Sequence, residues 1–398
     1  MSAAAGAAVT AEAERVLRQN WHEGERDGIH FSCTEPSPGR YPWQWYWDSC
    51  FAAIVWRRFD RDRARAELES LLAVQRPNGF VGHTIFWRRR VSFLRSFFYN
   101  VTSRTALQTE TIQPPLLAWA WRIAVGEPAT EPRIVAHMDW LAANRDLEGD
   151  GLLWIVQPDE SGLDASPKFE EVWGRRANGV GFPLLVRRNR KLGFDARRVH
   201  ERGHPVLCES LVNTMWSLSL QAMGRPSATP ALVERLWDES RGLFVDEALP
   251  GAVRPQALTW ASLAPLALPD LPAAIGRRLA EEHLLNPSEF LTAVAPPSVA
   301  TSEPSYEPDG GHGLLRRYWR GPTWINSAWM VWLGMRRLGY EAEARRLADD
   351  VIAAVAREGL REYYDPRDGT GLGAKDFAWS ALVAELANPE DAALTSYL

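Results

Sequence analysis

Apolar residues recur at three- and four-residue intervals along most of this chain, a spacing that is typical of amphipathic helices. The pattern predicts helices at 11–20, 48–59, 61–75, 115–125, 131–144, 206–223, 229–239, 273–284, 323–338, 341–357 and 376–387. The segment 206–223 is apolar nearly all round, which indicates a helix buried on both sides. The sequence therefore predicts an all-α protein.

Local signals agree with several of these helices. Asp48 and Asp60 are suited to N-cap positions, and Pro115 and Pro322 stand at or near predicted first turns. Short strand signals follow helices, each after a turn and a glycine, at 79–81, 151–155 and 242–245. Helix pairs that are each followed by a short β-hairpin indicate a ring of paired helices. The spacing of the glycines is irregular, so the repeat signal is weak.

No Ser/Gly-rich linker or long charge run divides the chain, so we expect residues 1–398 to form one domain. Three connections, 78–112, 146–204 and 288–321, exceed ordinary loop length, and long ordered loops are usually functional. All three adjoin polar motifs. We expect a helical toroid with catalytic loops at one end.

Composition excludes several classes of function. The net charge of −5 argues against binding to nucleic acid. No run of apolar residues approaches the roughly 18 that a membrane span needs. The first ten residues lack the features of a secretory signal, so a cytoplasmic location is expected. Cys33, Cys50 and Cys208 show no disulfide or metal spacing, and Cys50 and Cys208 fit buried free thiols. No metal or organic cofactor is expected.

Tryptophan is unusually frequent, with 19 residues. Several lie in polar motifs, namely Trp43, Trp45, Trp47, Trp87, Trp319 and Trp324, whereas Trp56, Trp119, Trp140, Trp216 and Trp237 fit helix cores. Sugar rings offer apolar C–H faces, so aromatic side chains beside carboxylates suit a carbohydrate site.

Two acidic motifs carry candidate chemistry. Glu160-Ser161-Gly162-Leu163-Asp164 places two carboxylates around a glycine in a segment too polar for a helix interior, and a second cluster follows at 361–366. A desolvated carboxyl can donate a proton near neutral pH, and two carboxylates are the usual machinery of glycoside hydrolysis. The alternative is that Glu160 and Asp164 are only turn and cap residues.

Four aromatic and polar clusters precede predicted helices, so a helical ring would collect them at one rim. They are the segments 41–49, 76–83, 111–115 and 317–324. Within them, Asp48 could cap its helix or accept hydrogen bonds from sugar hydroxyls, and His83 alone is more typical of a structural residue. Gln113 offers an amide that both donates and accepts at the mouth of the next helix.

In this order, the motifs WDS, GF-x-x-H, QPP, ESG-x-D-x-SP, YWRGP-x-W and EYYDP-x-x-G-x-G-LG resemble glycoside hydrolase family 63. The resemblance covers about residues 41–382 and points to the short bacterial enzymes that cleave mannosylglycerate or glucosylglycerate, with a weaker likeness to family 37 trehalases. It implies an (α/α)6 barrel and hydrolysis of an α-glycoside with inversion.

The resemblance also implies residue roles. Asp164 would be the general acid and Glu362 the general base, with carboxyls roughly 6.5–9.5 Å apart as inversion requires. The substrate-binding residues would be Tyr41, Trp45, Trp47, Asp48, His83, Gln113, Gly162, Tyr318, Trp319 and Trp324. Tyr318, together with nearby arginines, would face the aglycone.

Two features depart from the family pattern. Cys208-Glu209-Ser210 stands where relatives usually carry Asp-Pro or Asp-Val. The segment 88–110 is unusually basic and aromatic, and is either a solvated loop or a lid whose arginines meet an anionic aglycone such as glycerate. The arginine that would bind glycerate is left open among Arg187, Arg188, Arg197 and Arg198.

Two other classes of function fit the sequence less well. A sugar isomerase or epimerase on a similar toroid would rely on histidine pairs, and of the 8 histidines just His83 lies in a motif. A non-catalytic carbohydrate-binding protein would not need both carboxylates. The expected partner is a small carbohydrate; the choice between glucose and mannose, the aglycone and a possible homo-oligomer are left open.

Overall fold

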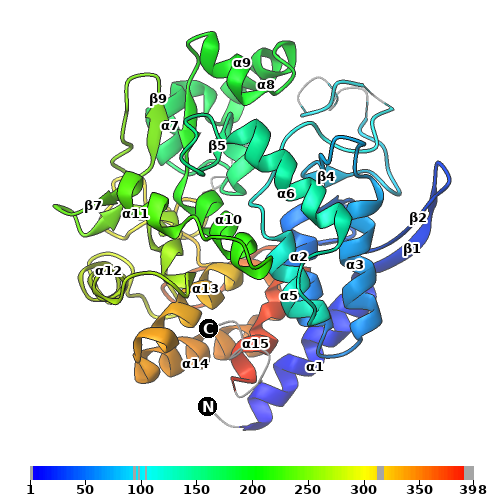
Figure 1. The fold of residues 1–398 in the computed structure, drawn as a ribbon. Helices are drawn as coiled ribbons and strands as arrows, with labels where there is room; N and C mark the ends of the chain where they lie inside the picture. The colour runs from blue at the N-terminus through cyan, green and yellow to red at the C-terminus, as the bar shows by residue number, and fades with distance from the viewer. Residues whose placement is uncertain (1–2, 93–95, 97–98, 104, 312–317, 390–398) are drawn as a thin grey trace.

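The computed structural model describes residues 3–92, 96, 99–103, 105–311 and 318–389. The α-helices are α1 (Ala3–Asn20), α2 (Tyr46–Trp56), α3 (Arg61–Ala73), α5 (Leu117–Val125), α6 (Pro132–Arg145), α7 (Lys168–Trp173), α8 (Phe182–Lys191), α9 (Ala196–Glu201), α10 (Ser210–Ala222), α11 (Thr229–Leu236), α12 (Ala273–Arg278), α13 (Ile325–Leu338), α14 (Glu341–Glu358) and α15 (Val383–Ala387) (Figure 1). The 3-10 helices are η1 (Pro158–Ser161), η2 (Gly174–Arg176), η3 (Gly179–Gly181), η4 (Trp260–Ala267) and η6 (Ala378–Leu382), and a π-helical turn, η5 (Leu279–Leu284), continues α12.

The strands are short and form small antiparallel sheets. They are β1 (Trp21–Arg26), β2 (Ile29–Thr34), β3 (Gln44–Trp45), β4 (Thr84–Ile85), β5 (Trp154–Ile155), β6 (Val206–Cys208), β7 (Trp237–Asp238), β8 (Leu243–Phe244), β9 (Glu247–Leu249), β10 (Arg361–Tyr364) and β11 (Gly371–Lys375). β1 pairs with β2, β3 with β4, β7 with β8 and β10 with β11, while β5, β6 and β9 form one three-stranded sheet.

Six helical segments close into an inner ring. α2 contacts α5, α5 contacts α10, α10 contacts η4, η4 contacts α13, α13 contacts η6, and η6 returns to α2. Along the chain these segments alternate with α1, α3, α6, α11, α12 and α14, which lie toward the outside (Figure 1). This closed ring of six helix pairs confirms the predicted all-α toroid.

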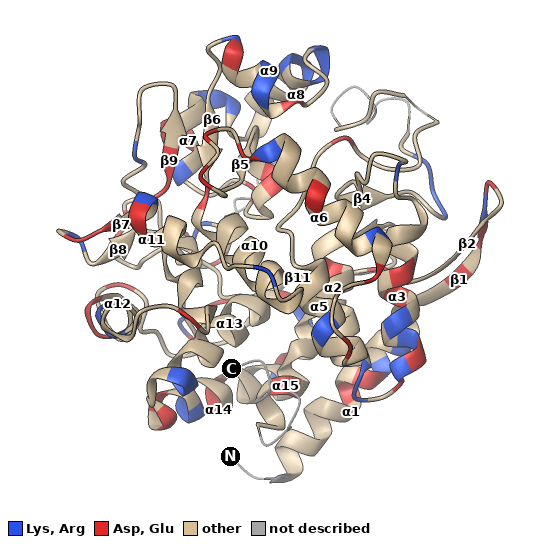
Figure 2. Ribbon diagram, viewed as in Figure 1, with Lys and Arg blue, Asp and Glu red and all other residues tan. Residues whose placement is uncertain are grey.

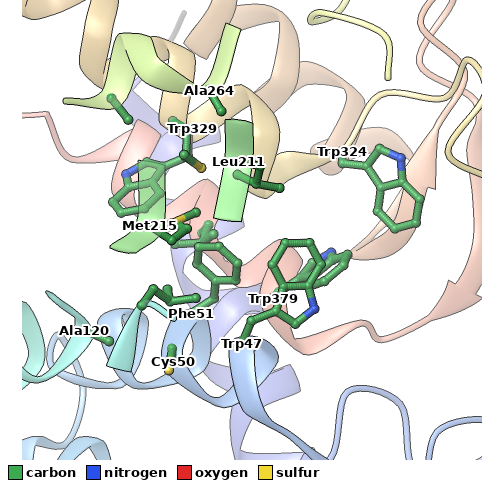
Figure 3. Packing of buried hydrophobic residues seen from close by; sticks show 14 of the residues in the cluster. Trp47, Cys50, Phe51, Ala120, Leu211, Met215, Ala264, Trp324, Trp329 and Trp379 are labelled. Carbon is green, nitrogen blue, oxygen red and sulfur yellow. The ribbon is translucent and has the colours of Figure 1, made fainter. Parts of the chain in front are cut away.

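Burial separates the two layers. All eleven residues of α2 and the first ten of α10 are buried, whereas α14 buries one apolar stripe and exposes the rest. A helix that is apolar all round must be covered on every side, which only the inner position provides. Charged side chains accordingly gather on α1, α3, α9, α12 and α14 and on loops (Figure 2). Inside the ring, Phe51, Met215 and Trp329 from three inner helices pack together (Figure 3).

The structure corrects several element boundaries. Residues 79–81 do not form a strand; the strand of that region is β4, which pairs with β3. Residues 206–208 are the central strand β6 and not the first turn of α10, because their backbone groups pair with β5 and β9 on either side. α11 ends at Leu236, where β7 begins. Strand pairing with segments far along the chain thus overrode the local helical pattern.

The expected caps were right for one helix and wrong for another. Asp60 is the N-cap of α3, and its side chain accepts a hydrogen bond from the Arg63 N–H at 3.1 Å. Asp48 is not an N-cap, because α2 begins at Tyr46 with Trp45 as the cap residue. The carboxyl of Asp48 lies instead in the first turn of α2.

Among the described residues, three α-helices and four 3-10 helices were not predicted. α7, α8, α9, η1, η2 and η3 lie within the connection 146–204, and η4 spans residues 260–267. The helices are short, and η4 contains Pro265, which weakens any helical signal. All three cysteines are buried free thiols, as expected for Cys50 and Cys208. In the described ranges, no helix has the length and apolar character needed to cross a bilayer.

Candidate active site

A cavity of about 510 Å³ opens at the end of the inner ring where its helices begin. All twelve residues that the sequence singled out for catalysis or substrate binding line it: Tyr41, Trp45, Trp47, Asp48, His83, Gln113, Gly162, Asp164, Tyr318, Trp319, Trp324 and Glu362. Four further lining residues are Pro36, Asp159, Phe377 and Trp379. The size suits a small ligand.

Inner-ring helices deliver many of these side chains from their N-terminal ends. Asp48 lies in the first turn of α2, Gln113 stands four residues before α5, Trp324 is the N-cap of α13 and Phe377 is the N-cap of η6. The N-terminal end of a helix carries partial positive charge, so this end of the ring favours carboxylates and oxygen-rich ligands.

Tryptophan side chains form one wall of the cavity and connect it with the core. The rings of Trp319 and Trp324 stack with centroids 4.0 Å apart and an interplanar angle of 7°. Trp379 meets both Trp47 and Trp324 edge to face, at 5.1 and 5.4 Å, so the wall continues into the packed interior (Figure 3). Because these rings are held on several sides, the wall is preorganised for a flat apolar face.

On another side of the cavity, His83 stacks on Trp45 with ring centroids 5.6 Å apart. Its Nδ1 lies 2.7 Å from the Thr111 hydroxyl, and burial lowers the pKa of His83 to about 3, so the imidazole is neutral at physiological pH. Gln113 accepts a hydrogen bond from the Trp47 N–H at 3.0 Å, which fixes its amide.

Asp164 sits in a strained loop between η1 and α7. Gly162 and Ala165 both have positive φ, of 73° and 65°, and the Arg320 guanidinium donates to the Ala165 carbonyl at 2.7 Å. The Tyr318 hydroxyl donates to Asp164 Oδ2 at 3.0 Å. Burial raises the pKa of Asp164 above its ordinary value, while the Tyr318 hydrogen bond acts in the opposite direction.

Glu362 lies in β10 where the pairing with β11 shifts register between Arg361 and Tyr363. Its Oε1 accepts a hydrogen bond from the Tyr41 hydroxyl at 2.8 Å, and its Oε2 accepts one from the Ala374 N–H at 2.8 Å. The Arg40 guanidinium stands 3.8 Å from Oε2. Three donors or positive groups therefore surround this carboxyl, whereas Asp164 has the Tyr318 hydroxyl as its side-chain donor together with its own backbone N–H.

Asp48, the third predicted carboxyl, is 6% exposed. Burial raises its pKa well above the ordinary value, and the nearby Glu362 carboxyl adds to the effect. Asp48 and Glu362 thus share one side of the cavity.

Glu160 does not line the cavity. Its carboxylate forms a bidentate pair with the buried Arg145 at 2.6 and 2.7 Å and accepts the backbone N–H groups of Ile112 and Val156. The first carboxylate of the acidic motif is thus structural, and it anchors the loop that carries Asp164.

Asp159, which the sequence analysis missed, is a fourth carboxyl at the cavity wall. Asp159 directly precedes Glu160 of the acidic motif, and this position was the sequence signal that could have identified it. Phe377 and Trp379 were also missed; their signal is an aromatic pair spaced by two residues at the start of a predicted helix.

The sequence left two questions open here: whether the basic segment 88–110 is a solvated loop or a lid, and which arginine would bind an anionic aglycone. Arg88 pairs with Glu35 at 3.0 Å, and Arg90 stands 3.9 Å from Asp27. None of Arg187, Arg188, Arg197 and Arg198 lines the cavity. Residues 93–95, 97, 98 and 104 of the segment 88–110, and Arg317 of the YWRGP motif, lie outside the described residues. Across the described ranges, no group of three His, Cys, Asp or Glu side chains could hold a metal ion.

A closed ring of helical hairpins, with carboxyls on different loops facing one aromatic cavity, defines the class of helical-toroid glycoside hydrolases. The model of the mannosylglycerate hydrolase MGH1-like glycoside hydrolase domain matches residues 41–226 and 223–380. The chain belongs to this family, which is of the glycoside hydrolase family 63 type, and it is a glycoside hydrolase.

Individual relatives agree. A mannosylglycerate hydrolase from Thermus thermophilus is 30% identical, over 88% of this chain and 95% of the relative. A glucosylglycerate hydrolase from Mycolicibacterium hassiacum is 25% identical, over 87% and 92%. The crystal structure of a family 63 mannosylglycerate hydrolase from Thermus thermophilus, in complex with Tris and D-glycerate, superposes with a TM-score of 0.78 at 27% identity, over 95% and 99%. Neutral trehalase from Saccharomyces cerevisiae, at 16% identity and a TM-score of 0.55, shares the fold.

Proposed function

We propose that this protein is an inverting α-glycosidase that hydrolyses a small α-glucosyl or α-mannosyl solute, with Asp164 as general acid and Glu362 as general base. The observation that carries the proposal is the contrast between two carboxyls that line one cavity. Asp164 has a raised pKa and one hydroxyl donor, whereas Glu362 is surrounded by donors. The proposal takes residues 1–398 as one catalytic domain.

The two environments suit opposite halves of the reaction. A protonated Asp164 gives its proton to the glycosidic oxygen as the C1–O bond breaks. The Glu362 carboxylate takes a proton from a water molecule whose oxygen bonds to C1 from the other face. The products are the sugar with inverted anomeric configuration and the free aglycone, so one water is consumed and the proton returns to the enzyme.

The glycone subsite would use the aromatic wall and the polar groups around it. Trp319 and Trp324 offer a flat face for the sugar ring, and Asp48 and Gln113 offer hydrogen-bonding groups for its hydroxyls. The names of the relatives favour mannosylglycerate or glucosylglycerate as the substrate class, with glycerate as the leaving group.

A sugar isomerase is disfavoured by the same cavity. His83 is the one histidine among the described lining residues, and burial lowers its pKa to about 3. A histidine acid–base pair has no second member there.

Proton NMR of the enzyme with α-linked solutes tests the proposal. The panel is glucosylglycerate, mannosylglycerate, glucosylglycerol, trehalose and kojibiose. Initial release of the β-anomer from one of them would support inversion and identify the substrate. Initial release of the α-anomer would contradict the roles given to Asp164 and Glu362, and turnover of a free monosaccharide without hydrolysis would favour the isomerase.

A further inference from the structure

A guanidinium without an acidic partner lies behind the cavity wall. Arg188 of α8 donates to Asn189 Oδ1 from Nε at 3.0 Å and from Nη2 at 2.8 Å. No carboxylate of the described residues lies within ion-pair distance of it, and burial lowers the pKa of Arg188 to about 10. A guanidinium can only donate, so the contact fixes the Asn189 side chain with its oxygen toward Arg188. The Asn189 Nδ2 accordingly donates to the Val156 carbonyl at 3.0 Å.

From Asn189 to Asp159 at the cavity wall, each amide nitrogen donates a hydrogen bond to an oxygen of the next side chain. Its Nδ2 also donates to Gln157 Oε1 at 2.9 Å. Gln157 Nε2 donates to Asn100 Oδ1 at 2.8 Å and to Asp159 Oδ1 at 2.7 Å, and Asn100 Nδ2 donates to Asp159 Oδ2. Asn189 and Gln157 are fully buried, and Asn100 is 2% exposed.

This chain of amides determines the form of Asp159. Each of its carboxyl oxygens receives an amide N–H, and neither neighbouring amide presents an acceptor to it. A protonated Asp159 would need such an acceptor, whereas a carboxylate needs donors alone. The Arg188 charge at the far end, with every amide oriented away from it, therefore favours the ionised Asp159.

The other titratable groups around Asp159 are few. Asp164 is on the same loop and in the same cavity, and Glu160 is neutralised by Arg145. Tyr318 donates to Asp164, and His83 is neutral. Burial, the Asp164 charge and the Glu160 charge raise the pKa of Asp159, and the Gln157 and Asn100 hydrogen bonds oppose them. Like charges in one cavity oppose each other, so ionisation of one of these two carboxyls raises the pKa of the other.

We propose that the chain Arg188–Asn189–Gln157–Asn100 holds Asp159 as a carboxylate, and that this negative charge keeps Asp164 protonated. Asp159 is thus a positioning residue that acts on the reaction through the general acid. The inference rests on the proposed function, because it assumes that Asp164 delivers the proton. It adds a reason why the general acid stays protonated.

Asp159→Asn tests the inference in the pH profile of kcat/KM. Loss of the like charge lowers the pKa of Asp164, so the alkaline limb moves to lower pH by about one unit, with about a tenfold loss of rate above it. The acidic limb of the profile is expected to stay where it is, because the variant changes a neighbour of Asp164. An α-glycosyl fluoride, whose leaving group needs no proton, is hydrolysed at close to the wild-type rate.

Two further variants separate charge from folding. Arg188→Met should move the alkaline limb in the same direction by a smaller amount, because the donor that orients Asn189 is lost. Lys191→Met removes an exposed positive charge from the same helix and should leave the profile unchanged. An unmoved alkaline limb in folded Asp159→Asn, with the wild type active, would overturn the inference and leave the proposed function standing.

A second readout needs no substrate. Infrared difference spectra across a pH titration show the band of a protonated carboxyl, and Asp164→Asn identifies the Asp164 band by its loss. We expect that band to disappear about one pH unit lower in Asp159→Asn than in the wild type. Persistence of the band to the same pH would overturn the inference even if no glycoside of the panel were hydrolysed.

Discussion

Asp164 and Glu362 are the same kind of acid held in opposite surroundings. Asp164 has a raised pKa, and the hydroxyl of Tyr318 is its side-chain donor. Glu362 receives a hydroxyl, a backbone N–H and a nearby guanidinium. Neither difference follows from residue type, so the assignment of acid and base depends on the neighbours that each side chain meets.

Substitution of the two carboxyls should have different consequences for different leaving groups. Asp164→Asn should lower kcat/KM for an α-linked solute by about 10²–10⁴-fold, because the leaving oxygen loses its proton donor. The same variant should keep most of its activity on a glycosyl fluoride. Glu362→Gln should lose activity on both substrates, since each reaction needs an activated water. Steady-state kinetics on the two substrates measures both effects.

Asp368 supplies the control for this pair, because it is an exposed carboxyl on the same hairpin as Glu362. Asp368→Asn should leave both rates unchanged. Equal losses on both substrates in Asp164→Asn would contradict its role as proton donor.

We expect the buried carboxyl of Asp48 to lower the stability of the folded protein at neutral pH. Burial raises its folded-state pKa, so folding is penalised once the pH exceeds the unfolded-state pKa, and the penalty is absent below it. Asp48→Asn should therefore raise the melting temperature by about 1–3 °C at pH 7, with the difference shrinking toward pH 4. Calorimetry at both pH values measures this, and a variant less stable than the wild type at pH 7 would contradict it.

Among the elements, the β10–β11 hairpin places Glu362 through backbone geometry. Gly373 of β11 has φ +69°, and a Cβ there would lie 2.6 Å from both Cβ and Oε2 of Glu362. Only glycine lets the two strands approach this closely beside the register shift. The position of Glu362 in this hairpin thus depends on a residue that has no side chain.

Gly373→Ala should displace the Glu362 carboxyl and lower kcat by at least about tenfold, because a shift near 1 Å misaligns the attacking water. Gly224→Ala is the matched control, since Gly224 has φ +70° but nothing within 4 Å of an added Cβ. Both variants carry the strain of positive φ, and only the first carries the clash. Similar kcat values in the two variants would show that the close approach is not needed.

The elements also show where sequence patterns suffice. Long amphipathic helices such as α14 and the doubly buried α10 were predicted because their burial follows directly from periodicity. β6 was taken for helix because its strand partners, β5 and β9, lie far along the chain. Short α8 was missed, although its Asn189 orders the amide chain behind Asp159. Local patterns record burial, and they do not record distant pairing.

At the scale of the whole molecule, ring closure turns separate motifs into one site. The twelve predicted residues come from loops, short strands and helix starts spread between Tyr41 and Glu362, and they share a cavity because the inner helices begin at the same end of the ring. The motif order made this grouping predictable. Asp159, Phe377 and Trp379 were not predictable in the same way, because lining a cavity depends on side-chain direction that no motif records.

Closure itself depends on a buried ion cluster between the two ends of the chain. Glu385 of α15 is fully buried and pairs with Arg57 at 2.7 Å and with Arg58 at 2.5 Å, directly after α2. α15 also contacts α1, and the first and last helices lie side by side (Figure 1). Helix α15 is therefore held against α1 and the end of α2 by charge as well as by packing.

Glu385→Gln should destabilise the whole protein by about 3–5 kcal/mol, because it removes the buried negative charge with which both guanidinium groups pair. Glu127→Gln is the control, since it breaks the exposed Arg65–Glu127 pair at 2.9 Å and should change stability by less than about 1 kcal/mol. Urea unfolding measures both, with kcat/KM of Glu385→Gln expected to match the wild type at 25 °C.

If the ring folds as one unit, far-UV circular dichroism and tryptophan fluorescence should give the same unfolding midpoint in each variant, because opening one contact of a closed ring removes the support of its neighbours. Separate midpoints would mean that the α15 end opens independently and that closure does not stabilise the site.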